Sequence, residues 1–122
     1  MAINRPFTIK IGSNGDKLFY RLSPVIDLTS ATVTFSMRPR NVTTPKIDQV
    51  AAQVANGTYI IDGVSFTYVP TDGVVFYDWP GANDLDTAGE FESEWNITKA
   101  GKSFKRPSQG YEIIIVSEDV PL

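Results

Sequence analysis

Short runs in which apolar and polar residues alternate at every second position dominate this sequence. From Ala31 to Arg38 the apolar residues fall on odd positions and hydroxyl or charged residues on even ones, until Pro39 ends the run. A period of two places successive side chains on opposite faces of a strand, whereas a helix needs a period of about 3.6. The pattern therefore predicts half-buried strands, with further runs at 7–11, 18–22, 64–68 and 91–98.

Turn-forming residues separate these runs and limit the length of each strand. Asn56-Gly57 is the strongest hairpin signal and predicts a turn before a strand at 58–62. The preceding segment, 47–54, suits either a strand or one or two helical turns. Tyr111–Val116 is almost wholly apolar, which is typical of a strand covered on both faces. About seven or eight short strands in 122 residues predict one all-β domain over residues 1–122, an antiparallel β-sandwich.

Strand parity identifies the expected core. Phe91, Trp95 and Ile97 share one face of the strand at 91–98, while glutamates and other polar residues occupy the opposite face. Large aromatic and aliphatic side chains on one face of a half-buried strand normally point into the core. We therefore expect the structural core to include Phe35, Phe91, Trp95, Ile97 and Tyr111.

The segment at 74–80 does not alternate, because large apolar residues occur at both parities. We interpret it as a connection that something must cover: either it folds back on its own sandwich, or it docks on a partner. Aromatic residues carry much of the energy of protein interfaces, which makes the second possibility worth testing. The candidate partner contacts are Val74, Val75, Phe76, Tyr77, Trp79 and Pro80.

Composition excludes most catalytic and metal chemistry. The chain has no cysteine and no histidine, so thiolate sites, disulfides and the commonest general base are absent. Glu90, Glu92 and Glu94 share one strand face and could form a carboxylate pair, but the opposite face is the core side, so we expect them to face water. We predict no enzymatic activity, no catalytic residues, no metal site and no cofactor.

Charge and hydropathy also limit the partners. The formal net charge of −3 argues against binding to nucleic acid, which favours a basic face. The longest apolar stretches are four residues, far short of the ~20 that span a membrane. No secretory signal precedes Phe7, so we expect the chain to start in the cytoplasm of the cell that makes it.

Several stretches, in order, resemble small structural proteins of tailed bacteriophages that are related to the immunoglobulin-like N-terminal domain of the phage baseplate upper protein. Asp27–Arg38 is similar to that family's Asp-Leu-Thr-Gly-Ala-Thr-Val segment with its closing Met-Arg, although Ser30 replaces the glycine. Asp86–Thr98 is similar to its Thr-Ala-Gly-x-Tyr-x-x-Glu-Trp-x-Val-Thr run. The segment 73–85 looks like an insertion. The smaller matches are Tyr68-Val69-Pro70, Gly101-Lys102, Phe104, Pro107 and Gly110-Tyr111.

The resemblance implies an immunoglobulin-like β-sandwich that serves as a non-enzymatic structural component of a tailed-phage virion, in the tail, baseplate or adaptor region. It would be made in the host bacterial cytoplasm and would dock other phage virion proteins, in multiple symmetric copies. An alternative function is a carbohydrate-binding module on the virion, with weak glycan contact. Its sugar platform would consist of Tyr77, Asp78 and Trp79.

We predict that divalent cations leave the stability of the protein unchanged. Its clustered carboxylates lie on one strand face rather than in an Asp-x-Asp-x-Asp-Gly loop, and it has no histidine or cysteine to add as ligands. The melting temperature should therefore be the same in millimolar calcium and in a chelator. A clear rise with calcium would contradict this expectation.

Overall fold

The computed structural model describes residues 7–12, 17–61, 63–81 and 84–117. Within them the chain forms ten strands and one short 3-10 helix. In chain order these are β1 (Phe7–Lys10), β2 (Leu18–Arg21), β3 (Thr32–Pro39), β4 (Ile47–Val54), β5 (Gly57–Ile61), β6 (Val64–Tyr68), η1 (Pro70–Asp72), β7 (Val74–Tyr77), β8 (Gly89–Lys99), β9 (Lys102–Arg106) and β10 (Glu112–Ser117).

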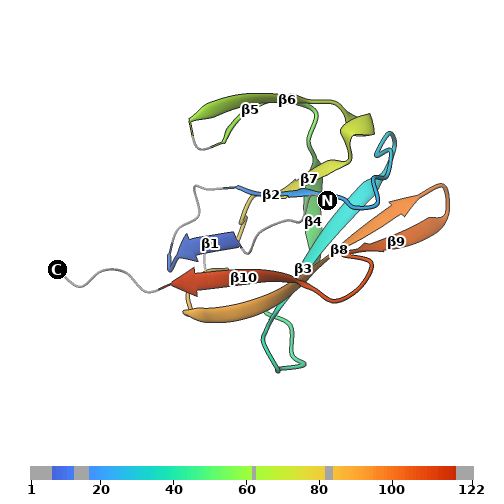
Figure 1. Cartoon of the computed structure of the whole chain (residues 1–122). Coiled ribbons are helices and arrows are strands. Elements are labelled where there is room, and N and C mark those ends of the chain that lie inside the picture. Colours follow the sequence, from blue (N-terminus) through green and yellow to red (C-terminus); the bar gives the residue numbers. More distant parts are fainter. Residues whose placement is uncertain (1–6, 13–16, 62, 82–83, 118–122) are drawn as a thin grey trace.

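Eight of the strands form one continuous sheet in the order β1-β10-β8-β3-β4-β7-β2, with β9 paired to β8. The sheet folds over at β4, whose residues from Ile47 to Ala52 pair with β3 while Gln53 and Val54 pair with β7. The two halves thus face each other across the core, as a sandwich that approaches a closed barrel (Figure 1). The prediction of an all-β sandwich is confirmed.

The strand count and one pairing differ from the expectation, since the described residues form ten strands rather than seven or eight. β1 pairs with β10 in parallel, so the sheet is mixed rather than purely antiparallel. The segment 47–54 is a strand, which settles the choice between strand and helical turns. Its central place between β3 and β7 explains the outcome, because a strand there can complete the hydrogen-bond ladders of both neighbours.

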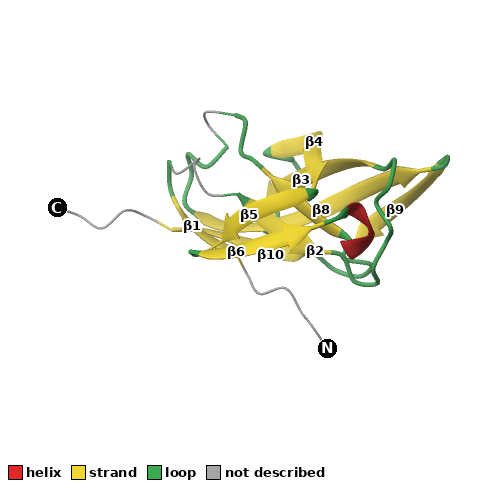
Figure 2. Ribbon diagram, turned by 90° about the horizontal axis from the view of Figure 1, so that it is seen from above, coloured by secondary structure: helices red, strands yellow, loops and turns green. Residues whose placement is uncertain are grey.

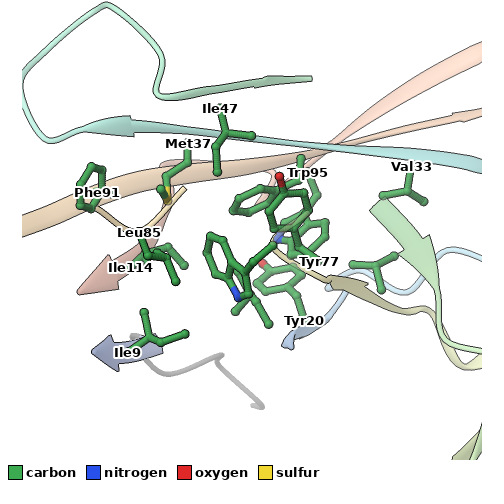
Figure 3. Packing of buried hydrophobic residues seen from close by; sticks show 14 of the residues in the cluster. Ile9, Tyr20, Val33, Met37, Ile47, Tyr77, Leu85, Phe91, Trp95 and Ile114 are labelled. Carbon is green, nitrogen blue, oxygen red and sulfur yellow. The ribbon is translucent and has the colours of Figure 1, made fainter. Parts of the chain in front are cut away.

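A column of aromatic rings joins the two halves of the sandwich. The ring of Phe35 in β3 lies 4.6 Å from that of Tyr77 in β7 and 4.8 Å from that of Trp95 in β8. Trp95 in turn stacks on Tyr20 of β2 at 5.8 Å, and Tyr77 meets Trp79 edge-on at 5.0 Å. Figure 3 shows Tyr20, Tyr77 and Trp95 pointing toward one another between the strands. The column therefore packs together β2, β3, β7 and β8, which are distant from one another in the sequence.

The core prediction is confirmed for four of its five residues. Phe35, Phe91, Trp95 and Ile97 are all buried. The prediction for Tyr111 is wrong, because 43% of this residue is exposed and it lies just before β10 rather than at the start of the strand. The reason is parity, since the even positions of β10 face the core and the odd ones face out. The inward place next to Tyr111 belongs to Glu112, a charged residue type that is seldom buried.

The segment predicted to be a connection or a partner contact contains a strand of the domain itself. β7 pairs with β2 on one side and with β4 on the other, and all four of its residues are buried. Val75 and Tyr77 belong to the main core, whereas Val74 and Phe76 belong to a second cluster on the outer face. A strand covered on both faces has no polar side, which explains why its sequence does not alternate.

The hairpin of β5 and β6 provides that outer cover. It forms a separate two-stranded sheet, which lies over β7 and β2 in Figure 1 and over the main sheet in the view of Figure 2. Tyr59 and Tyr68 pack against the cluster of Val74 and Phe76. The hairpin that Asn56-Gly57 predicts is not formed, because β5 pairs with β6 while β4 pairs with β3 and β7. These two residues instead mark the corner where the chain leaves the main sheet.

We predict that Trp95→Ala lowers the free energy of unfolding by ~3–5 kcal/mol, the usual cost of deleting a large aromatic side chain from a packed core. Trp95 is 0% exposed and contacts the rings of both Tyr20 and Phe35. Urea melts would measure the change, and Val25→Ala, which truncates an exposed side chain, is the matched control. A loss below about 1 kcal/mol for Trp95→Ala would contradict the assignment.

Candidate interaction surfaces

The predicted partner contacts at 74–80 are mostly inside the domain. Five of the six are at most 3% exposed, so the prediction that they contact a partner is wrong for Val74, Val75, Phe76, Tyr77 and Trp79. The sixth, Pro80, is exposed. The predicted sugar-binding platform is not formed either, because the rings of Tyr77 and Trp79 are buried. Its third residue, Asp78, forms an ion pair with Lys17 at 3.4 Å. Val75, Tyr77 and Trp79 are buried because they belong to the main core, whereas Val74 and Phe76 are buried because the hairpin covers the outer face of β7.

The three glutamates of β8 lie on its outer face, and each faces its own cation. Glu90 pairs with Arg40 at 2.9 Å, Glu92 with Arg38 at 3.2 Å, and Glu94 with Lys105 at 3.7 Å. General acid catalysis by a carboxyl needs an apolar setting that keeps it protonated. A row of ion pairs on an open sheet face offers the opposite setting, so it supports a structural role for these residues.

A shallow groove of about 380 Å³ lies on this charged face. Its floor is formed by β3 and β8, and Thr43 and Pro45 border it. Arg38 crosses it, donating hydrogen bonds to Glu92 at 3.2 Å and to the Tyr111 hydroxyl at 2.9 Å, with its guanidinium 4.8 Å from the centre of the tyrosine ring. These polar groups of the groove thus satisfy one another, and Tyr111, which is not a core residue, braces Arg38.

Glu112 is the one carboxylate in the described residues that is buried, with 6% of the residue exposed. It accepts hydrogen bonds from Trp95 Nε1 at 3.2 Å and from Ser93 Oγ at 3.5 Å. Burial raises its pKa to about 8, against the opposing effect of those two donors. Sequence analysis missed this residue because a single charged side chain in an apolar strand gives no indication of which face it occupies.

The inner half of the hairpin is anchored by aromatic contacts. On β5, the ring of Tyr59 lies 5.3 Å from Phe76 and 5.4 Å from Phe19, both edge-on. On β6, Tyr68 stands 6.5 Å from Tyr59 and has the guanidinium of Arg21 over its ring at 5.9 Å. These contacts hold the hairpin against β2 and β7 as a built part of the domain.

The outer half of the hairpin leaves its apolar side chains in water. Phe66, Val64 and Ile60 are 40%, 54% and 77% exposed, and Val69, which follows β6, is 49% exposed. They make up half of the eight large apolar side chains that are exposed in the described part of the chain. We call the residues of β5 and β6, 57–61 and 64–68, the hairpin arm. Exposed apolar patches of this kind usually mark interaction sites.

The sequence contains a signal for the hairpin arm. The register pairs Tyr59 with Phe66 and Gly57 with Tyr68, so their side chains share one face together with Ile61 and Val64. Asp62-Gly63 between the two runs is a favoured two-residue hairpin turn, although Asp62 lies outside the described residues. What the sequence does not show is that only half of this face is covered.

The described residues offer no group of three or more acidic, cysteine or histidine side chains arranged around a possible metal ion. Among them there is also no helix with the length and hydropathy to cross a membrane. The strongest candidate surface in the described part of the chain is the exposed apolar half of the hairpin arm.

We predict that Glu112 makes the protein less stable as the pH rises from 5 to 8. With a folded-state pKa of about 8 and an ordinary value of 4.5, the folded chain binds the extra proton across this range, so stability is complete below the ordinary value and is lost as the pH rises through the folded one. The loss is at most about 1.4 kcal/mol per pH unit. The chain has no histidine side chain to obscure the effect.

Urea melts between pH 5 and 8 would test this. Glu112→Gln keeps an acceptor for Trp95 Nε1 and cannot ionise, so its stability should be nearly independent of pH and should exceed that of the unchanged protein at pH 8. Glu94→Gln, which alters a half-buried carboxylate on the outer face of the neighbouring strand, is the control. Equal slopes for the unchanged protein and Glu112→Gln would contradict the assignment.

Comparison of the chain with protein-family models, with curated proteins and with solved structures finds no match to any of them.

Proposed function

We propose that this protein is a non-enzymatic structural component of a tailed-phage virion and that it docks a neighbouring virion subunit through the hairpin arm. The single observation that carries the docking role is the exposed apolar outer half of the arm, where Phe66 and Val64 on one face are 40% and 54% exposed and Ile60 on the other face is 77% exposed. A patch of this kind favours a partner surface over water by about 25 cal/mol for each Å² that is buried.

The virion assignment draws on the resemblance of two stretches to phage structural proteins. Asp27–Arg38 leads into and includes most of β3, and Asp86–Thr98 covers most of β8. These two strands are neighbours, paired from Thr32↔Thr98 to Pro39↔Phe91. The resembling residues thus form the centre of the sheet, the part of a sandwich most tied to its fold. The segment 73–85, which looks like an insertion, contributes β7.

The remaining surfaces favour binding over catalysis. The carboxylates on the open face of β8 are each paired with a cation, and the buried Glu112 hydrogen-bonds to Trp95 and Ser93. The carbohydrate-binding alternative has less support, because Tyr77 and Trp79 lie in the core rather than on a platform. A rigid domain that presents one exposed apolar surface, the hairpin arm, fits a role in assembly best.

The test is incorporation into particles. In a phage whose own copy of the gene carries Val64→Ser with Phe66→Ser, purified particles should contain at least tenfold less of this protein than unchanged particles, measured by quantitative immunoblot. The purified variant should remain folded with only a small fall in melting temperature, because both side chains are partly exposed and the anchoring contacts of Tyr59 and Tyr68 are kept. Val42→Ser, also exposed and outside the arm, is the control and should be incorporated normally.

Two results would overturn the proposal. If the unchanged protein is absent from purified particles, it is not a virion component. If the double variant is folded and is incorporated as well as the control, the docking surface lies elsewhere on the chain.

A further inference from the structure

We infer that the partner of the hairpin arm is a second copy of this chain: β6 pairs with β6 of the other copy across a two-fold axis, and the two arms form one four-stranded antiparallel sheet. The inference rests on the proposed docking role of the arm and names its partner. Four observations lead to it, concerning the edge of β6, the charge of the arm, its symmetry and its anchoring.

The outer edge of β6 is available for pairing. Within the described residues β6 pairs with β5 alone, and Val64, Ser65, Phe66 and Thr67 are all exposed. An edge strand presents unpaired N–H and C=O groups that readily accept another strand. Proteins usually protect such edges with charged residues, proline or a bulge, but β6 reads Val-Ser-Phe-Thr-Tyr and its register with β5 is continuous. The edge is therefore unprotected.

The arm carries no charge on its described residues, 57–61 and 64–68. The cation that contacts it, Arg21, lies over Tyr68 at the anchored end of β6. Two copies of the arm can thus approach without bringing like charges together, although each chain has a net charge of −3. The open face of β8, by contrast, is lined with charged residues, and burying such groups against an uncharged strand would leave them poorly solvated.

A two-fold axis perpendicular to the arm fits its pattern of side chains. Identical strands related by such an axis run antiparallel, and each keeps the same face upward. The faces of both copies that carry Tyr59, Val64 and Phe66 then form one continuous apolar surface, while the opposite surface is lined by Thr58, Ile60, Ser65 and Thr67. The same strand sequence satisfies both sides of the contact, which is what an isologous interface requires.

The arm is also rigid enough to present its edge. Tyr59 is held against Phe19 and Phe76, and Phe66 stacks on Tyr68 with ring centres 6.1 Å apart and an interplanar angle of 1°. Rings packed in this way fix the hairpin before it meets a partner, so less conformational entropy is lost on association.

Single cysteines give a direct test, because the natural chain has none. Val64→Cys, Ser65→Cys, Phe66→Cys and Thr67→Cys would each be oxidised mildly and analysed on non-reducing gels. Directly opposed residues of paired strands have Cβ atoms about 4.5–5.5 Å apart, close to disulfide distance. We expect a covalent dimer that is strongest at the position nearest the axis. The exposed controls Thr58→Cys on β5 and Ser103→Cys on β9 should stay monomeric.

A charge on the edge of β6 should weaken the association. In sedimentation equilibrium the unchanged protein should show a concentration-dependent dimer, and Phe66→Lys should weaken it at least tenfold, because the axis would bring two lysines close together. Val42→Lys, with a similar exposure of 43%, should dimerise normally. A thermal melt would show whether Phe66→Lys is folded; if it is not, Ser65→Lys on the same strand takes its place.

The outcomes separate this inference from the proposed function. If the unchanged protein stays monomeric and the β6 cysteines crosslink no better than Thr58→Cys and Ser103→Cys, in solution and in particles, the second-copy inference is wrong. Loss of the serine double variant from particles would then still support docking to a different virion protein. If the β6 pairing is observed but that double variant is incorporated normally, the inference stands and the docking proposal fails.

Discussion

The strand β7 has to be shielded from water on both faces, and most of the architecture follows from that requirement. Its inner residues, Val75 and Tyr77, complete the core between the two halves of the sandwich, and its outer residues, Val74 and Phe76, need a second layer. The main sheet has no strand to spare for that layer, so the hairpin arm supplies it. Without the arm, two large side chains at the centre of a sheet would lie in solvent, at a cost of about 1.5–3 kcal/mol each.

The two halves of the arm therefore have different roles: one covers the domain and the other stays exposed. The half that carries Tyr59 and Tyr68 stabilises the domain by covering Phe76, whereas the half that carries Val64 and Phe66 extends beyond the contact and stays exposed. Because the anchored half fixes the position of the exposed half, an apolar edge is presented in a defined orientation. This coupling is what makes the arm a better docking candidate than a mobile loop of the same composition.

The opposite side of the molecule is organised by charge. The outer face of β8 is covered by ion pairs to Arg38, Arg40 and Lys105, and Arg38 is further held by Tyr111. Ion pairs near a surface contribute little stability each, but they cover this face with charged groups. Glu112, buried beneath Trp95, is the one described carboxylate whose ionisation opposes folding, since burial disfavours its charged form. The two sides of the domain thus differ in kind, because one is covered by ion pairs and the other exposes apolar side chains.

The sequence by itself determined the fold class and much of the core. Alternation is a local property that follows from the geometry of a strand, so the spacing of Phe35, Phe91, Trp95 and Ile97 was enough to assign them to the core. It could not tell that 74–80 runs through the interior, because a strand covered on both faces and an exposed apolar connection have the same composition. Nor could it place Tyr111 outside and Glu112 inside, since parity says which residues share a face and only the packing of β10 against β8 and β1 says which face is inward. The exposed half of the arm was likewise decided by the tertiary structure, because coverage depends on contacts between residues far apart in the chain.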